Sequence, residues 1–284
     1  IAMVIKKQQG NRRVEAHIKR RKIESIIDGE LDSEEMVMNR AEEFGWNLPG
    51  SITVLLFENQ YLQKIPVRDI RDAGRHRTKV FITIAAAVHS KAHGAGVVEH
   101  GNRVMVLYGL QPGWDETESK KATEMLARTC CEELEKANVG HTIVGMSRTI
   151  TGMLKIKDGL EQAKRALEFG RRDVAQGRCF HFDGLGVYRI LVHCDEAEIR
   201  QFQRDMLEEL IRYDERNDTE LLRTLEAVLE SDLNLHKAAD RLFVHYNTLR
   251  YRMNRVREIA GIDLKLPEHR LNLQVALKIW RMRS

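Results

Sequence analysis

The sequence has few cysteines, few prolines and no long apolar run. None of its four cysteines belongs to a C-x-x-C pair, and the adjacent Cys130 and Cys131 are poorly spaced for a disulfide or a zinc site. The longest apolar stretch, residues 80–88, is shorter than the ~18–20 residues of a membrane span and indicates a buried helix. The start of the chain is rich in Lys and Arg but lacks the apolar segment of a signal peptide. These absences favour a cytoplasmic protein with reduced thiols.

Motifs for phosphate, metal and nucleophilic chemistry are also missing. The chain has no G-x-x-x-x-G-K-[ST] loop, and the glycines between residues 94 and 101 precede a strand pattern rather than a helix. His89 and His93 have a spacing that a metal could use, but no third ligand accompanies them, so surface histidines are the favoured interpretation. Residues 193–195 (His-Cys-Asp) give no general-base arrangement. We therefore predict no catalytic residue, no metal and no cofactor.

Positive charge is concentrated at the C-terminal end. The chain has 46 Lys and Arg against 42 Asp and Glu, a net charge of +4. Residues 232–284 hold 11 basic and 5 acidic residues, a net of +6, so the remainder carries −2. A solvated helix surface is the simpler alternative, but this uneven distribution favours a surface that binds phosphates.

Residues 234–260 have the pattern of two short helices joined by a tight turn. Asn234 and Asn247 are the predicted N-caps of the two helices. Phe243 stands at the turn position where glycine is common, and we expect its ring to plug the core. The second helix has one apolar stripe, formed by Leu249, Met253, Val256 and Ala260. The segment is therefore predicted to be a helix-turn-helix.

The other side of the second helix is polar and basic, which predicts contact with double-stranded DNA. Arginine can bind guanine edges and asparagine can bind adenine edges. Base or near-base contacts are expected from Asn247, Arg250, Tyr251, Asn254 and Arg255. Phosphate contacts are expected from Lys237, Arg241, Arg252 and Arg257, and Tyr246 and Thr248 complete the predicted set.

This segment resembles the C-terminal domain of the PucR/CdaR-type bacterial transcription regulators, which control purine catabolism and sugar-diacid use. The matching positions are Tyr213, Asp214, Leu221, Leu222, Thr224, Leu225, Asn234, Ala238, Ala239, Leu242, Val244, His245, Asn247, Thr248, Leu249, Tyr251, Arg252, Arg255, Val256, Glu258, Ile259, Gly261, Ile262, Asp263 and Leu264. The likeness continues through a final amphipathic helix over residues 267–282. The resemblance implies an operator-binding regulator of a catabolic operon that responds to a small-molecule effector and acts as a homodimer or higher homo-oligomer.

The middle of the chain is predicted to be an α+β domain with an antiparallel-rich sheet and helices on one face. Its predicted strands are residues 52–57, 97–98, 104–107, 142–147 and 179–182, with helices at 69–93, 116–137 and 160–169. The turn at 99–103 is a strong hairpin signal. This order resembles the GGDEF-like, nucleotide-cyclase-like domain of the same regulators.

The acidic residues that a cyclase needs to hold magnesium are absent. The hairpin turn contains His100, Gly101, Asn102 and Arg103, and the first strand is followed by the single carboxylate Glu58. We therefore predict a catalytically inactive domain for dimerisation or signal relay, not an enzyme. A nucleotide- or metabolite-binding sensor and a residually active cyclase are the alternatives.

Four segments are expected. Residues 1–50 form a helical leader, with one helix that ends near Gly29 and a second that Ser33 caps. Residues 51–185 form the GGDEF-like domain. Residues 186–217 form a connector with a helix at 195–213, and 218–284 form the all-α DNA-binding domain. Because the chain begins at Ile1 rather than methionine, we expect that an upstream part is missing. A sensor domain either lies before residue 1 or is not recognisable in this sequence.

Overall fold

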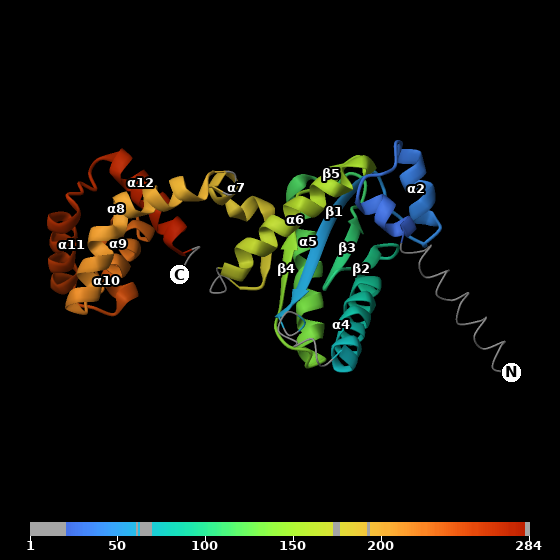
Figure 1. Cartoon of the computed structure of the whole chain (residues 1–284), viewed down its shortest axis with the longest axis horizontal. Coiled ribbons are helices and arrows are strands. Elements are labelled where there is room, and N and C mark those ends of the chain that lie inside the picture. Colours follow the sequence, from blue (N-terminus) through green and yellow to red (C-terminus); the bar gives the residue numbers. More distant parts are fainter. Residues whose placement is uncertain (1–20, 61, 63–69, 173–176, 192–193, 282–284) are drawn as a thin grey trace. The chain divides into compact units, whose positions relative to one another are not determined.

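The computed structural model describes residues 21–60, 62, 70–172, 177–191 and 194–281. The chain divides into two compact units, one ending at Gly186 and one beginning at Val187. Figure 1 shows a sheet with helices in the first unit and helices alone in the second. The predicted class, α+β followed by all-α, is confirmed.

The first unit is built on a six-stranded sheet. Its strands are β1 (Ser51–Asn59), β2 (Gly96–His100), β3 (Arg103–Gly109), β4 (Thr142–Met146), β5 (Ile150–Thr151) and β6 (Cys179–His181). The order is β2-β3-β1-β4-β6, with β5 paired to β1, and every pair is antiparallel except β4 with β6. The predicted hairpin is present, since Gly101 takes a positive φ of 61° between β2 and β3.

Helices cover both faces of this sheet. Leu55 and Phe57 of β1 share a core with α4 (Ile70–Lys91) and α5 (Glu116–Lys136). The other face packs against α6 (Ile156–Arg172), so closely that a Cβ on Gly145 of β4 would lie 2.1 Å from the Ala163 carbonyl oxygen. The expectation of helices on one face was therefore wrong. Residues 52–57 are apolar at almost every position, which is typical of a strand buried on both sides.

The remaining elements of the first unit are short. Residues 21–27 are helical, and α2 (Glu34–Glu42) begins after Ser33, whose side chain accepts a hydrogen bond from the Met36 amide as predicted. The start of the predicted first helix lies outside the described residues. The described residues of this unit also include two 3-10 turns, η2 (Met153–Lys155) and η4 (Phe182–Leu185).

The second unit is entirely helical in its described part. Its helices are α7 (Tyr188–Leu191), α8 (Glu196–Asn217), α9 (Leu221–Glu230), α10 (Leu235–Leu242), α11 (Tyr246–Ala260) and α12 (Pro267–Arg281). Helix α8 runs past residue 213, where the connector helix was expected to end, and its buried Leu207 and Leu210 join the core formed by α9 to α12. The predicted domain borders stay predictions.

Candidate nucleic-acid interface

Helices α10 and α11 form the predicted pair of helices around a tight turn. The Asn234 side chain caps α10, because its oxygen accepts hydrogen bonds from the amides of His236 and Lys237 at 3.1 Å each. Ala238 and Ala239 are buried against the neighbouring helices. Small side chains at these two positions allow α11 to cross α10 closely, as the sequence indicates.

The N-cap of α11 is His245 rather than the predicted Asn247. The ring nitrogen Nδ1 of His245 accepts a hydrogen bond from the Asn247 amide at 3.2 Å, and Tyr246 is the first helical residue. A histidine can replace the usual Asn or Ser because a neutral imidazole has one acceptor nitrogen. As a consequence, the Asn247 side chain is exposed on the first turn of the helix.

Phe243 occupies the turn between α10 and α11, but it does not plug the core. Its backbone is left-handed, with φ 54°, and the residue is 96% exposed. Leu242 and Val244 on either side pack against the core. The turn therefore already directs two side chains inward, and the one between them points into solvent.

Helix α11 separates its two sides as predicted. Leu249, Met253 and Val256 are buried against the core of the unit, and Ala260 packs at its margin. The opposite side consists of exposed residues at helical spacing: Asn247, Arg250, Tyr251, Asn254 and Arg257. Thr248 is exposed beside them, whereas Tyr246 is half-buried and stacks on the His236 ring at 4.3 Å.

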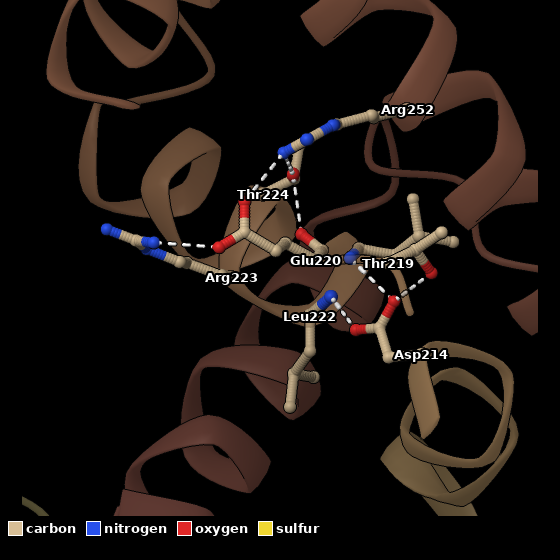
Figure 2. A network of polar contacts seen from close by, with 8 residues as sticks. Asp214, Thr219, Glu220, Leu222, Arg223, Thr224 and Arg252 are labelled. Atoms are coloured by element: carbon tan, nitrogen blue, oxygen red, sulfur yellow. Dashed lines mark hydrogen bonds and ion pairs between the residues drawn. The ribbon is translucent and has the colours of Figure 1, made fainter. Parts of the chain in front are cut away.

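Arg252 and Arg255 hold α11 against the helices before it. Arg252 Nη1 lies 3.3 Å from a carboxylate oxygen of Glu220 and 3.4 Å from the Thr224 hydroxyl, as Figure 2 shows. Arg255 Nε donates to the Tyr213 hydroxyl at 3.2 Å, and its guanidinium lies 5.2 Å from the centre of that ring. The Tyr213 hydrogen bond, followed by an ion pair with Glu258 at 2.7 Å, raises the pKa of Arg255.

Asp214, near the C-terminal end of α8, caps α9 from a distance along the chain. Its two carboxylate oxygens accept hydrogen bonds from the amides of Leu221 at 2.8 Å and Leu222 at 2.9 Å, and Thr219 Oγ1 donates to it at 2.6 Å (Figure 2). Glu220, which immediately precedes α9, makes no capping bond of its own. The sequence marked Asp214 only as part of the family resemblance. Its role was missed because an N-cap is sought next to the helix that it caps.

The other basic residues of the predicted DNA-contact set differ in whether an ion pair already occupies them. Arg241 of α10 forms an ion pair with Glu230 at 2.5 Å, and Glu230 also accepts from Arg281 at 2.5 Å. Lys237, Arg250 and Arg257 are exposed and form no ion pair within the described part of the chain. Within the predicted DNA-contact set, the cations that form no ion pair among the described residues are therefore Lys237 of α10 and Arg250 and Arg257 of α11.

In the first unit, two arginines already compensate the charge of Glu58, the carboxylate near the end of β1. Glu58 is 2% exposed; Arg103 of the adjacent strand donates to it at 2.8 Å, and Arg171 of α6 forms a second ion pair with it. Burial by itself would raise the pKa of Glu58, but the hydrogen bonds from Arg171 and Arg103 outweigh it and lower the pKa. A carboxylate whose oxygens meet two guanidinium groups is a poor ligand for magnesium.

Other sequence features have ordinary structural roles. All four cysteines are unpaired thiols, and burial raises the pKa of Cys130 to about 12, which leaves it protonated.

His89 is exposed, with its Nδ1 2.7 Å from the Ala85 carbonyl oxygen of its own helix. Among the helices of the described residues, none has both the length and the apolar character needed to span a membrane.

A short turn between two crossed helices, with the polar side of the second facing outward, defines a DNA-binding protein of the helix-turn-helix class. Residues 221–279 match the PucR C-terminal helix-turn-helix domain, and residues 28–169, half of the chain, match the GGDEF-like domain. The chain belongs to the PucR/CdaR-type family of transcription regulators with a GGDEF-like domain.

Named relatives are similar over part of their length. The chain is 34% identical over 106 residues to the proline-responsive transcriptional activator PutR of Bacillus subtilis, covering 37% of this chain and 25% of that protein. It is 34% identical over 87 residues to the purine catabolism regulatory protein of the same organism, covering 31% and 16%. The carbohydrate diacid regulator of Escherichia coli is 41% identical over 63 residues, covering 22% and 16%. The matches thus span a quarter or less of these relatives.

Proposed function

We propose that this protein is a cytoplasmic, ligand-responsive transcription regulator that binds operator DNA through α10 and α11 and controls a catabolic operon. The observation that carries the proposal is the exposed side of α11, where Arg250 and Arg257 have no ion-pair partner among the described residues. The names of the relatives refer to proline, purines and carbohydrate diacids, which supports a catabolic target.

The DNA-facing set comprises all eleven residues predicted from the sequence, with different roles. Asn247, Arg250, Tyr251 and Asn254 face the bases, because they share the exposed side of the helix. Tyr246 and Thr248 lie beside them at the start of α11, and Lys237, Arg241 and Arg257 meet phosphates. Arg252 and Arg255 are at the margin, where their bonds to α8 and α9 fix the angle of α11 and leave part of each guanidinium for the DNA.

The first unit acts in signal relay or in assembly of a homo-oligomer rather than in catalysis. The support for inactivity is the pairing of Glu58 with Arg103 and Arg171, since two guanidinium groups already compensate the carboxylate charge that would bind a metal ion. Incubation of the purified protein with GTP and magnesium is expected to give no cyclic dinucleotide. Formation of such a product would contradict this part of the proposal.

A metabolite-binding role for the first unit is the second candidate, and one observation favours it. A cleft of about 830 Å³ lies beside the β2–β3 hairpin and is lined by Phe81, His100 and Asn102, among others. This volume is within the range of small-molecule sites. Arg77 lines the same cleft and donates to the Asn102 side chain at 2.7 Å. Calorimetry with GTP and with proline, purines and sugar diacids tests this role, and absence of heat with all of them would leave only relay or assembly.

The main proposal is tested by the salt dependence of DNA binding. A duplex enriched by the protein from a random pool is titrated at about 50 to 200 mM potassium chloride. Arg257→Ala is expected to reduce the slope of log affinity against log salt by about 1, because Arg257 meets a phosphate. Arg250→Ala is expected to relax the base preference, because Arg250 reads a base. The matched control is Arg212→Ala, which removes an exposed arginine of α8 that pairs with Glu208. Affinity that is indifferent to salt would refute DNA binding through this surface.

A further inference from the structure

The exposed ring of Phe243 is unexplained by folding. Phe243 has the largest exposed fraction, 96%, of the large apolar side chains at the surface of the described residues. Its φ of 54° places it in the left-handed region, which glycine and asparagine enter much more readily than other residues. The side chain therefore adds nothing to the core, and the backbone at this position disfavours a phenylalanine. A contact with another molecule accounts for both facts.

The surroundings of the ring indicate the kind of molecule. Phe243 follows Arg241 by two residues and precedes the exposed side of α11, which begins at Asn247. The exposed Lys237 lies on the same α10. An apolar protein surface would leave the unpaired Lys237 without an anionic partner, whereas DNA offers phosphates to the cations and apolar groups to the ring. These apolar groups are the deoxyribose carbons and the thymine methyl.

We propose that Phe243 makes an apolar contact with duplex DNA at the edge of the groove that receives α11. The contact rests on the proposed function, because it requires α10 and α11 to bind DNA. It adds an element that the polar residues do not supply, since a ring packed on sugar or methyl groups gains affinity without releasing counterions. Phe243 is thus a contact residue, and its effect on binding is separable from that of the arginines.

The test uses Phe243→Gly, Phe243→Asn and Phe243→Tyr in the full chain. Glycine and asparagine fit the left-handed backbone, so the urea midpoint of either variant is expected to be no lower than that of the parent protein. Their affinity for the enriched duplex is expected to fall about tenfold, with an unchanged salt slope. Phe243→Tyr keeps the ring and is expected to bind within about twofold of the parent. Leu271→Ala, which removes another exposed apolar side chain of this unit, is the control and should bind unchanged.

The outcomes separate this inference from the proposed function. If the parent protein binds the duplex and Phe243→Gly binds equally well, the contact is refuted while the DNA-binding proposal stands. A changed salt slope, or a lowered urea midpoint in both the glycine and asparagine variants, would also overturn an apolar contact with DNA. If the parent binds no duplex, both proposals fail. Replacing thymine by uracil in the duplex separates the two apolar partners. If Phe243 contacts the thymine methyl, the affinity of the parent falls and that of Phe243→Gly does not. If Phe243 contacts deoxyribose, neither affinity changes.

Discussion

Replacing Asp214 is expected to loosen the N-terminus of α9 and, with it, the support of α11. In Asp214→Ala, the amides of Leu221 and Leu222 lose the carboxylate that accepts from them at 2.8 and 2.9 Å. Both leucines are buried, at 3% and 6% exposure, so water is a poor substitute for the lost acceptor. The neighbouring Glu220, which pairs with Arg252 of α11, lies in the same turn (Figure 2).

The magnitude follows from the bonds that are removed. Loss of a helix cap costs about 1 kcal/mol, and a hydrogen bond to a charged group contributes about 1.5–3 kcal/mol. Because the two amides share one carboxylate, we expect Asp214→Ala to cost about 2–3 kcal/mol. Asp214→Asn keeps one acceptor oxygen and should cost about half as much. For a unit of this size, the alanine change corresponds to a fall in Tm of about 10–20 °C.

The measurement is hydrogen exchange of the α9 amides in the full chain, followed by mass spectrometry, with urea unfolding in parallel. Exchange reports on α9 itself, which matters because a chain of two units need not unfold in one step. The matched control is Asp205→Ala, also on α8, which loses only an exposed hydrogen bond with Gln201. If Asp214→Ala leaves the exchange of α9 as slow as in the parent and in the control, the capping argument is wrong.

Two further predictions concern carboxylates that pair with arginines. Glu58→Gln should destabilise the first unit by about 3–5 kcal/mol, because two guanidinium groups lose a buried partner. Since the folded-state pKa of Glu58 is lowered, its contribution is complete above the ordinary glutamate value of about 4.3 and is lost as the pH falls through the folded pKa. The parent should therefore lose more stability than Glu58→Gln in urea unfolding below about pH 4.3, and parallel curves would contradict this. Glu230→Gln should raise DNA affinity by up to about fivefold, because it frees Arg241 for phosphates. Glu208→Gln on α8 is the control. Unchanged or weaker DNA binding by Glu230→Gln would contradict a competition between Glu230 and phosphate for Arg241.

The sequence was sufficient for features that depend on neighbours along the chain. The stripe of Leu249, Met253 and Val256 predicted the buried side of α11, because residues three and four apart share one side of a helix. Ser33 and Asn234 were found as caps because an N-cap acts on amides two or three residues ahead. The same local rules located the hairpin and most helices.

Local rules failed where the direction or role of a side chain depended on which positions its neighbours in the folded unit already occupied. Phe243 was expected in the core, but Leu242 and Val244 occupy the inward directions of the turn. Asn247 was expected to cap α11, but His245 lies two residues earlier and accepts the bond. The second helical layer on the sheet was missed although the apolar run of residues 52–57 indicates burial on both faces, because a strand's pattern does not identify the helix that covers it.

The sequence by itself determined the class of fold, the helix-turn-helix and the excess of positive charge at one end of the chain. Only the tertiary structure decided which partner each charged side chain binds. Arg255 donates a hydrogen bond to Tyr213, 42 residues away, and Arg171 pairs with Glu58, 113 residues away. Helical periodicity is repeated every few residues and can be read from any short window. An ion pair between distant residues exists only after the chain has folded, because folding alone brings the two groups within a few ångströms.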